Sequence, residues 1–351
     1  MDCCNEDSVQ MERKPTGDVT RRSMLKGAAA AASLIPAAVN APLARAQNKT
    51  IKLAFCSQLL CITPYEVANK RGHFKKHGLD VELVYTRGGN AAMQAMVGGA
   101  VGYAATSMVV AIRAYAKGAN IRRFCTTGRL PLFALATAPK TANEIKTVKD
   151  LEGRTVGVSA LGNADHALLL YLLAKAGVDK DKVQFATMGV NLLEGLRQGQ
   201  VDAGLVQEPA LTLVERHGAR VLFNAMDYED ARKQFGGAYE FMGVAVRTPE
   251  IKARRTEMVA LAKALADALI DLRKLSGADL VNALPRELTA GLDKKEFGEI
   301  LVRYRDSLYP ENVTIDPPAS QRVAESLVVG GLLKQADANI SGLLELSIAG
   351  S

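Results

Sequence analysis

An order of alternating strand and helix patterns that occurs twice is the feature that most constrains the fold of this 351-residue chain. In the first copy the patterns cover 50–55, 64–77, 80–85, 90–97, 103–105 and 107–117. In the second copy they cover 155–159, 164–176, 183–187, 192–198, 203–206 and a helix from Pro209. Because parallel strands need a crossover connection, the order predicts an α/β chain with two lobes, each a mostly parallel sheet flanked by helices.

Short sequence matches support an internal repeat. Residues 96–101 and 196–201 share an apolar residue, then glycine, then valine at the same spacing, one hundred residues apart. Residues 78–80 likewise resemble 177–179. These matches fall at equivalent places in the element order, so we interpret the two lobes as copies of one unit.

Two extended segments, 131–137 and 239–246, lie where the chain would leave the first lobe and return to it. We expect them to be crossover hinges. The first lobe would then comprise residues 47–136 plus 243–351, and the second lobe residues 137–242. After Thr248 the apolar spacing is helical to the C-terminus, which predicts helices that pack on the first lobe.

The N-terminus has the pattern of an export signal. Paired arginines within 20–26 precede an alanine-rich stretch, 27–43, and a small-x-small site at 44–46. This order is typical of a twin-arginine signal peptide spanning residues 1–46, removed on export. The alternative, a membrane anchor, needs roughly 20 strongly apolar residues, which this stretch lacks. We therefore expect a periplasmic protein.

The charged residues indicate what the chain does not bind. Lys and Arg number 44 against 37 Asp and Glu, and the signs are mixed along the sequence. No continuous basic stripe results, so we expect no nucleic-acid partner. The pair His73 and His77 has helical spacing but lies among basic residues, which favours a solvated helix end over a metal site. We expect a monomer with no metal or cofactor.

The sequence does not decide between a disulfide and free thiols for the cysteines after the expected signal. Cys3 and Cys4 belong to the expected signal, whereas Cys56, Cys61 and Cys125 would remain in a compartment where disulfides persist. A Cys56–Cys61 bridge and free buried thiols are both compatible with the sequence.

Ligands of open α/β sheets bind beyond the carboxyl ends of the strands. That rule selects the loops 56–62, 87–90, 106–107, 159–165 and 207–209. In the loop 159–165, backbone N–H groups can hold an oxyanion such as sulfonate, carboxylate or nitrate, although Asp165 would repel one, and simple helix capping by Ser159 or Asn163 is the alternative. The candidate ligand-binding residues are Ser57, Gln58, Tyr65, Gly88, Gly89, Asn90, Thr106, Ser107, Ser159, Gly162, Asn163, Glu208 and Tyr239.

Several candidates also have ordinary structural interpretations. Tyr65 is placed to stack on a planar ligand or to lie in a surface loop. Tyr239 is placed to line the cleft floor or to pack at a hinge. Glu208 is placed to accept a ligand hydrogen bond or to begin the helix beside Pro209.

Three motifs carry a resemblance to a known family. They are Gly72-x-Phe74-x-x-x-Gly78-Leu79-x-Val81, Asp150-Leu151-x-Gly153-Arg154-x-Val156-Gly157-Val158 and Gly199-x-Val201-Asp202-Ala203-x-x-x-x-Glu208-Pro209. In this order they resemble the sulfonate/nitrate/taurine-type solute-binding proteins of ABC importers, a group that includes binding proteins for thiamine-pyrimidine precursors. The resemblance implies a type II periplasmic binding-protein fold, a ligand between the lobes and an ABC permease in the inner membrane as partner. One departure is Gly102, where the family usually has aspartate.

The resemblance leaves three hypotheses for function. The leading one is a carrier without catalytic activity for a small organic or inorganic anion: a sulfonate, nitrate, or an aromatic or heterocyclic acid. The alternatives are an enzyme of the thiamine-pyrimidine synthase type on the same scaffold and a ligand-sensing binding protein.

Overall fold

Residues 50–350 of the chain are described by a computed structural model. The predicted signal peptide lies outside these residues and stays a prediction. The first sheet has five strands in the order β2-β1-β3-β10-β4. Their bounds are β1 Ile51–Cys56, β2 Val81–Thr86, β3 Tyr103–Ser107, β4 Ile121–Thr126 and β10 Met242–Arg247. Only β10 runs antiparallel to its neighbours.

The second sheet repeats this topology, in the order β7-β6-β8-β5-β9. Its strands are β5 Ala134–Thr137, β6 Thr155–Val158, β7 Gln184–Thr187, β8 Ala203–Val206 and β9 Val221–Asn224. Here β5 is the antiparallel strand, in the same place as β10 in the first sheet. The predicted two-lobed α/β fold with mostly parallel sheets is confirmed.

The expected hinge segments are mostly strands. β5 belongs to the second sheet and β10 to the first. Each segment therefore ends as a strand that pairs within the lobe that the chain is entering. The division expected between residues 136 and 137 falls inside β5. We place the crossovers at 127–133 and 236–241, between β4 and β5 and between α8 and β10.

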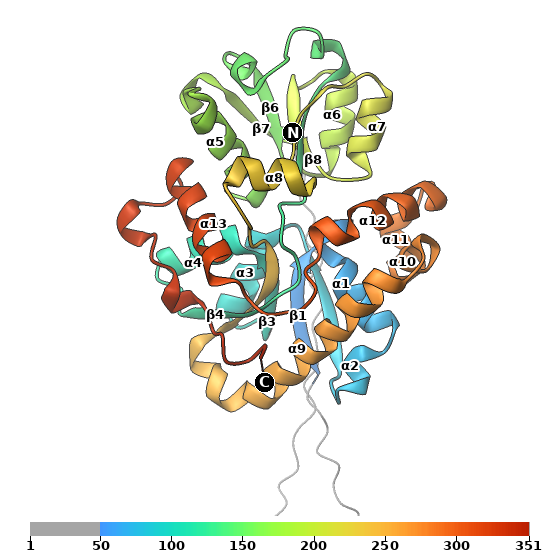
Figure 1. Cartoon of the computed structure of the whole chain (residues 1–351), viewed down its shortest axis with the longest axis vertical. Helices are drawn as coiled ribbons and strands as arrows, with labels where there is room; N and C mark the ends of the chain where they lie inside the picture. The colour runs from blue at the N-terminus through green and yellow to red at the C-terminus, as the bar shows by residue number, and fades with distance from the viewer. Residues whose placement is uncertain (1–49, 351) are drawn as a thin grey trace, which may run out of the picture. The chain divides into compact units, whose positions relative to one another are not determined.

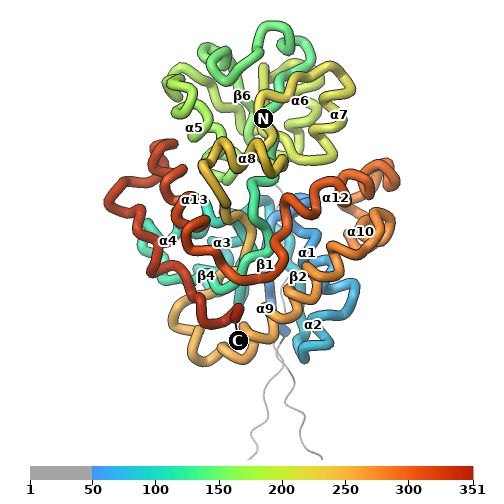
Figure 2. The backbone as a smooth tube through the Cα atoms, in the orientation of Figure 1, coloured from blue at the N-terminus to red at the C-terminus, as the bar shows by residue number. Residues whose placement is uncertain are grey.

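Helices cover both sheets (Figures 1 and 2). Those in contact with the first sheet are α1 Leu59–Lys70, α3 Gly89–Val97 and α4 Met108–Ala116. Those in contact with the second sheet are α5 Ala164–Ala176, α6 Leu192–Gln198, α7 Ala210–Arg216 and α8 Tyr228–Phe235. The close fit of α6 on its sheet requires glycine, since a Cβ at Gly157 would lie 2.3 Å from Leu192 Cδ1.

The C-terminal part is helical, as predicted. Its helices are α9 Ile251–Lys274, α10 Gly277–Ala283, α11 Arg286–Thr289, α12 Lys294–Leu308 and α13 Pro317–Val329. α9 and α10 contact α1, in agreement with packing on the first lobe. α13 contacts α5 as well as α4, so it reaches the second lobe too, which the sequence did not predict.

The helix expected over 64–77 is two helices, and it begins earlier. α1 starts at Leu59, and Gly72, at φ 75°, separates it from α2 His73–Lys76. Pro64 lies inside α1 and has no N–H for the carbonyl of Leu60, four residues before it. The buried Tyr309 hydroxyl donates to that carbonyl at 2.8 Å, so a residue far along the chain satisfies the group that proline leaves free.

Gly102, the departure from the family pattern, lies at the amino end of β3. Its counterpart Asp202 accepts a hydrogen bond from the Thr155 N–H at 2.9 Å, which ties β8 to β6. At Gly102 a Cβ would lie 2.6 Å from Arg254 Nη2, and Arg254 Nη1 donates to the Gly102 carbonyl. The first sheet therefore uses Arg254 for a turn contact where the second uses a carboxylate, at the edge opposite the strand ends that carry the candidate site.

Candidate functional site

A small cavity lies where loops from both sheets meet. Its volume is about 40 Å³, room for a few water molecules. The lining residues come from the carboxyl ends of β1, β2, β3 and β6 and from both crossovers: Cys56, Gln58, Cys61, Arg87, Gly88, Gly89, Thr106, Ser107, Val110, Phe133, Ser159, Asn163, Ala164, Asp165, Phe241 and Met242. The strand ends of the first lobe therefore meet the second lobe at a small space whose wall is both polar and apolar.

Many of the predicted site residues line this cavity. They are Gln58, Gly88, Gly89, Thr106, Ser107, Ser159 and Asn163. Ser107 also caps α4, because its hydroxyl accepts the Val110 N–H at 3.3 Å. The structure thus brings together residues from four loops that the strand-end rule selected.

The two predicted tyrosines lie elsewhere. Tyr65 is fully buried, is stacked on Phe55, and bonds to the Thr127 hydroxyl at 2.7 Å. Tyr239 is buried against Phe235 and bonds to Ser326 at 3.1 Å. Both are core residues whose hydroxyls already have partners inside the protein. Tyr239 packs beside the second crossover, which agrees with hinge packing, whereas Tyr65 lies inside α1 and not in a surface loop.

Four other candidates also lie outside the cavity lining. Ser57 donates to the Thr86 carbonyl at 2.9 Å and so ties the ends of β1 and β2. Glu208 is buried and accepts the Thr212 N–H at 3.0 Å, which is the helix-starting role. The Gly162 carbonyl accepts from Arg113, and Asn90 lies in the first turn of α3.

Residues of the loop at the start of α5 form hydrogen bonds with one another. The Asp165 carboxylate accepts hydrogen bonds from both the N–H and the hydroxyl of Ser159, the latter at 2.8 Å. The Ser159 N–H, a candidate donor to an oxyanion, is therefore already used. Asn163 Nδ2 donates to the Ser159 hydroxyl at 3.1 Å, and its side chain makes no capping hydrogen bond. Burial raises the pKa of Asp165 despite these bonds, because a charged carboxylate is poorly solvated there.

Two polar atoms at the cavity lack a partner. Thr106 is 1% exposed, and its Oγ1 has no hydrogen bond within the described part of the chain. The same holds for Asn163 Oδ1 on the opposite side. Buried polar groups are normally satisfied, so these two atoms are available to bond to a water molecule or another molecule in the cavity. Gly89 keeps this space open, since a Cβ there would lie 2.6 Å from Thr106 Oγ1.

Arg87 brings positive charge to the rim. It lines the cavity, is exposed, and forms no ion pair among residues 50–350. It directly precedes Gly88 and Gly89, whose small size lets a ligand approach the backbone. Sequence reasoning placed Arg87 in a selected loop but did not choose it; an arginine at a strand end before two glycines was the available signal.

Direct contacts join the two lobes around the cavity. Gln207, after β8, donates from Nε2 to Gln58 Oε1 at 2.7 Å. Arg113, on α4, donates to the Gly162 carbonyl, and burial lowers its pKa. Gln207 and Thr106 are near-equivalent positions of the two copies, and both contribute to this meeting point.

A buried arginine supports the wall of the cavity. Arg123 is fully buried and donates to the carbonyls of Thr106, at 3.1 Å, and Phe241, at 2.8 Å. Its Nη2 lies 3.9 Å from Glu240 Oε2, and Glu240 also accepts from Thr126. Burial lowers the pKa of Arg123 and raises that of Glu240. This group fixes the end of β3 to the second crossover.

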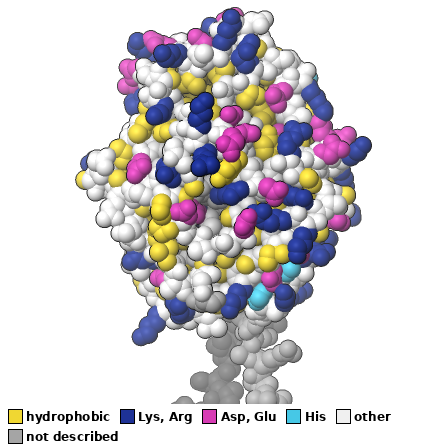
Figure 3. All heavy atoms as spheres, in the orientation of Figure 1, with side chains coloured by type: hydrophobic (Ala, Val, Ile, Leu, Met, Phe, Trp, Pro, Cys, Tyr) yellow, Lys and Arg dark blue, Asp and Glu magenta, His cyan; other side chains and the backbone are white. Residues whose placement is uncertain are grey.

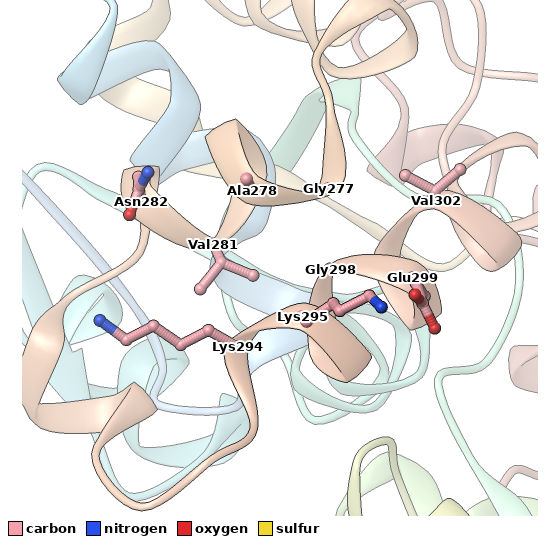
Figure 4. Close-up of a pocket in the computed structure, with 9 residues that line it drawn as sticks. All are labelled: Gly277, Ala278, Val281, Asn282, Lys294, Lys295, Gly298, Glu299 and Val302. Carbon is pink, nitrogen blue, oxygen red and sulfur yellow. The ribbon is translucent and has the colours of Figure 1, made fainter.

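A larger cavity of about 560 Å³ lies between α10 and α12 (Figure 4). The helices approach closely here, because a Cβ at Gly277 would lie 2.6 Å from the Gly298 carbonyl carbon. Val281 and the lysines 294 and 295 border it, away from the strand ends of either sheet. On the face in Figure 3, Lys and Arg side chains are interspersed with Asp and Glu. Neither feature matches the chemistry of the cavity between the lobes.

No helix among the described residues is both long and apolar enough for a membrane span. Likewise, residues 50–350 hold no group of three or more His, Cys, Asp or Glu side chains placed to bind a metal ion.

Solved structures with the same fold are numerous. A protein from Bordetella bronchiseptica RB50 matches with a TM-score of 0.78 and 22% identity, over 86% of this chain and 96% of that one. The alkanesulfonate-binding protein SsuA from Xanthomonas axonopodis pv. citri, bound to MOPS, matches with a TM-score of 0.67 and 18% identity, over 84% and 98%. The periplasmic nitrate-binding protein NrtA from Synechocystis PCC 6803 matches with a TM-score of 0.63 and 12% identity, over 86% and 87%.

These likenesses establish the periplasmic binding-protein fold, and several of the similar structures are ABC-type solute-binding proteins. A search of curated proteins gave no match. A family model described as NMT1/THI5 like matches residues 61–273, more than half of the chain. The chain therefore belongs to the NMT1/THI5-like family.

Proposed function

We propose that this chain is an extracytoplasmic solute-binding protein that closes its lobes on a small anion and delivers it to an ABC importer. The observation that carries the proposal is the cavity shared by both lobes, with two buried polar atoms that lack partners and an arginine at its rim. The sulfonate- and nitrate-binding proteins with the same fold support the same class of ligand.

The proposed mechanism is a population shift between open and closed lobes. Thr106 belongs to the first lobe and Asn163 to the second, so one ligand touches both only when the lobes are closed. The ligand then stabilises the closed form by the energy of those extra contacts. The Gln58–Gln207 hydrogen bond across the lobes adds to the closed form without a ligand.

The chemistry of the wall favours an anion with an apolar portion. Arg87 and the Thr106 hydroxyl provide charge and a donor for an oxyanion. Phe133 and Phe241 offer an apolar surface, with ring centroids 6.1 Å apart and planes nearly perpendicular. Small sulfonates and aromatic or heterocyclic acids match both features of the wall, whereas nitrate matches only the polar one. The proposal rests on binding alone and assigns no catalytic step.

The predicted export signal supports a periplasmic location for this activity. The partner would be an inner-membrane permease, and the binding protein would act as a monomer. A ligand-sensing protein would bind its ligand in the same cleft, so the ligand site is proposed for both roles and the permease only for the transport role.

A thermal-shift screen tests the proposal on the full chain. Nitrate, ethanesulfonate, benzoate and a pyrimidine carboxylate serve as probes, because a ligand that binds only the folded state raises Tm. Isothermal titration of the best probe follows, on wild type, Thr106→Val and Arg87→Gln. The Thr106 hydroxyl has no internal partner, so valine should leave stability unchanged and weaken binding at least about tenfold, the loss of one hydrogen bond to a charged group.

Arg197→Gln is the matched control, since Arg197 is a surface arginine of the second lobe paired with Glu194. It should bind like wild type. Equal affinities in Thr106→Val, Arg87→Gln and wild type would remove this cavity from the site. The screen also includes the neutral amide of the pyrimidine carboxylate. Binding of this amide in preference to every anion would overturn the proposed ligand class.

A further inference from the structure

Two cysteines face the cavity from neighbouring elements. Cys56 is the last residue of β1 and Cys61 lies in the first turn of α1, and both line the space between the lobes. They are 5% and 4% exposed, and both are free thiols in this structure. We propose that Cys56 and Cys61 are a redox-active pair, which an external disulfide oxidises to a disulfide bond in the wall of the cavity.

The geometry brings the two cysteines to one wall. Both side chains line the same cavity of about 40 Å³, and the neighbouring thiol is the largest influence on the pKa of each. A short loop of Ser57 and Gln58 joins their elements, and the Cys61 N–H donates to the Gln58 carbonyl at 3.0 Å. A disulfide needs an S–S distance of about 2 Å, and rotation of the two side chains within the cavity wall changes the distance between the sulfur atoms.

The surroundings make the two thiols unequal. The hydrogen bond from Cys61 lowers the pKa of Cys56 and outweighs the effect of burial, whereas the same contact raises the pKa of Cys61. Cys125, on β4, is a third buried cysteine, and burial raises its pKa to about 12. Because the thiolate is the nucleophile, Cys56 is the attacking residue and Cys125 the inert comparison within the same chain.

The reaction is thiol–disulfide exchange in two steps. The Cys56 thiolate attacks one sulfur of the external disulfide, a Cys56–S bond forms, and the external S–S bond breaks to release one thiolate. Cys61 then loses its proton to solvent and attacks the Cys56 sulfur, which releases the second external thiolate. The protein pair gives up two electrons and two protons, and the external disulfide becomes two thiols.

Oxidation also changes the contact between the lobes. The Cys61 thiol donates to Gln58 Oε1, with Sγ and Oε1 3.7 Å apart. Gln58 and Gln207 are the two residues whose side chains bond across the lobes. Formation of the disulfide removes the thiol proton of Cys61, and with it the hydrogen bond that Cys61 donates to Gln58. The cavity of about 40 Å³ cannot admit a disulfide reagent, so the exchange takes place when the lobes are apart.

The test uses the reduced full chain and oxidised glutathione. After incubation, acid quenching, denaturation and alkylation, trypsin yields the peptide 53–70, which contains both cysteines. We expect this peptide to carry no alkyl group after oxidation and to weigh two hydrogen atoms less than its reduced, unalkylated form. Cys125 should be alkylated before and after oxidation. Cys3 and Cys4 lie in other peptides and do not obscure the result.

Two single variants identify the roles. Cys61→Ser should collect glutathione on Cys56, since the resolving thiol is missing, and Cys56→Ser should collect several-fold less on Cys61. Cys125→Ser, the matched control, should oxidise like wild type. A wild-type peptide 53–70 that keeps both alkyl groups, or that carries glutathione on each cysteine without a link, overturns the proposal. This wild-type readout decides the matter even where a variant does not fold, and it is independent of ligand binding.

Discussion

Tyr309 satisfies a backbone carbonyl that proline leaves free, and this relation predicts a specific energetic coupling. In α1, Pro64 cannot donate to Leu60, and the Tyr309 hydroxyl takes that place at 2.8 Å. The substitution Tyr309→Phe removes only the hydroxyl. The Leu60 carbonyl is then buried without this donor, which costs about 1–3 kcal/mol of the free energy of unfolding.

Pro64→Ala supplies the matched background. An alanine at position 64 restores the N–H four residues after Leu60, so the carbonyl regains its helical partner. Tyr309→Phe should then cost at least about 1 kcal/mol less than it does beside Pro64. Urea denaturation of wild type, both single variants and the double variant gives this coupling energy directly. Equal costs of Tyr309→Phe in the two backgrounds would refute the reasoning.

Three further predictions concern the cavity. Gly89→Ala places a Cβ 2.6 Å from Thr106 Oγ1, so the thermal shift with nitrate or ethanesulfonate should disappear while circular dichroism stays unchanged; a retained shift would contradict this. Gln207→Ala removes the bond to Gln58 and should raise the radius of gyration in small-angle scattering without ligand, whereas an unchanged radius would argue against the bond as a closing contact. Burial raises the pKa of Asp165, so its protonated form is favoured in the folded state. The free energy of unfolding of wild type, relative to Asp165→Asn, should therefore fall as the pH rises above about 4 in urea titrations. A difference that stays constant with pH would show that Asp165 does not titrate in this way.

The repeat made most of the fold predictable from the sequence. The strand and helix patterns of residues 50–117 and 155–216 recur in the same order, and this order alone predicts parallel strands joined by crossovers. The antiparallel partners of β3 and β8 were missed, because short apolar segments between lobes read equally as linkers or strands. Only pairing with a distant strand distinguishes them.

The candidate site was predictable as a set of loops but not as a set of side chains. Gln58 and Gly89 follow strand ends, Thr106 lies at the end of β3, and all three line the cavity, as that rule predicts. Tyr65 lies in the helix that follows β1, and Tyr239 lies just before β10. Both side chains are buried in the core, which sequence spacing does not determine. Arg123 carries no sequence signal at all, since its role depends on carbonyls of β3 and of the second crossover.

The strand order has a consequence for how the chain acquires its structure. The second sheet is built from one continuous stretch, β5 to β9, so all of its ladders are present once Asn224 has been synthesised. In the first sheet, β3 and β4 are joined through β10, which arrives only after that whole stretch. Until residues up to Arg247 have been synthesised, the edges of β3 and β4 that pair with β10 have backbone N–H and C=O groups without strand partners. The inserted lobe should therefore mature first, and the lobe that begins the chain should be the last to be finished.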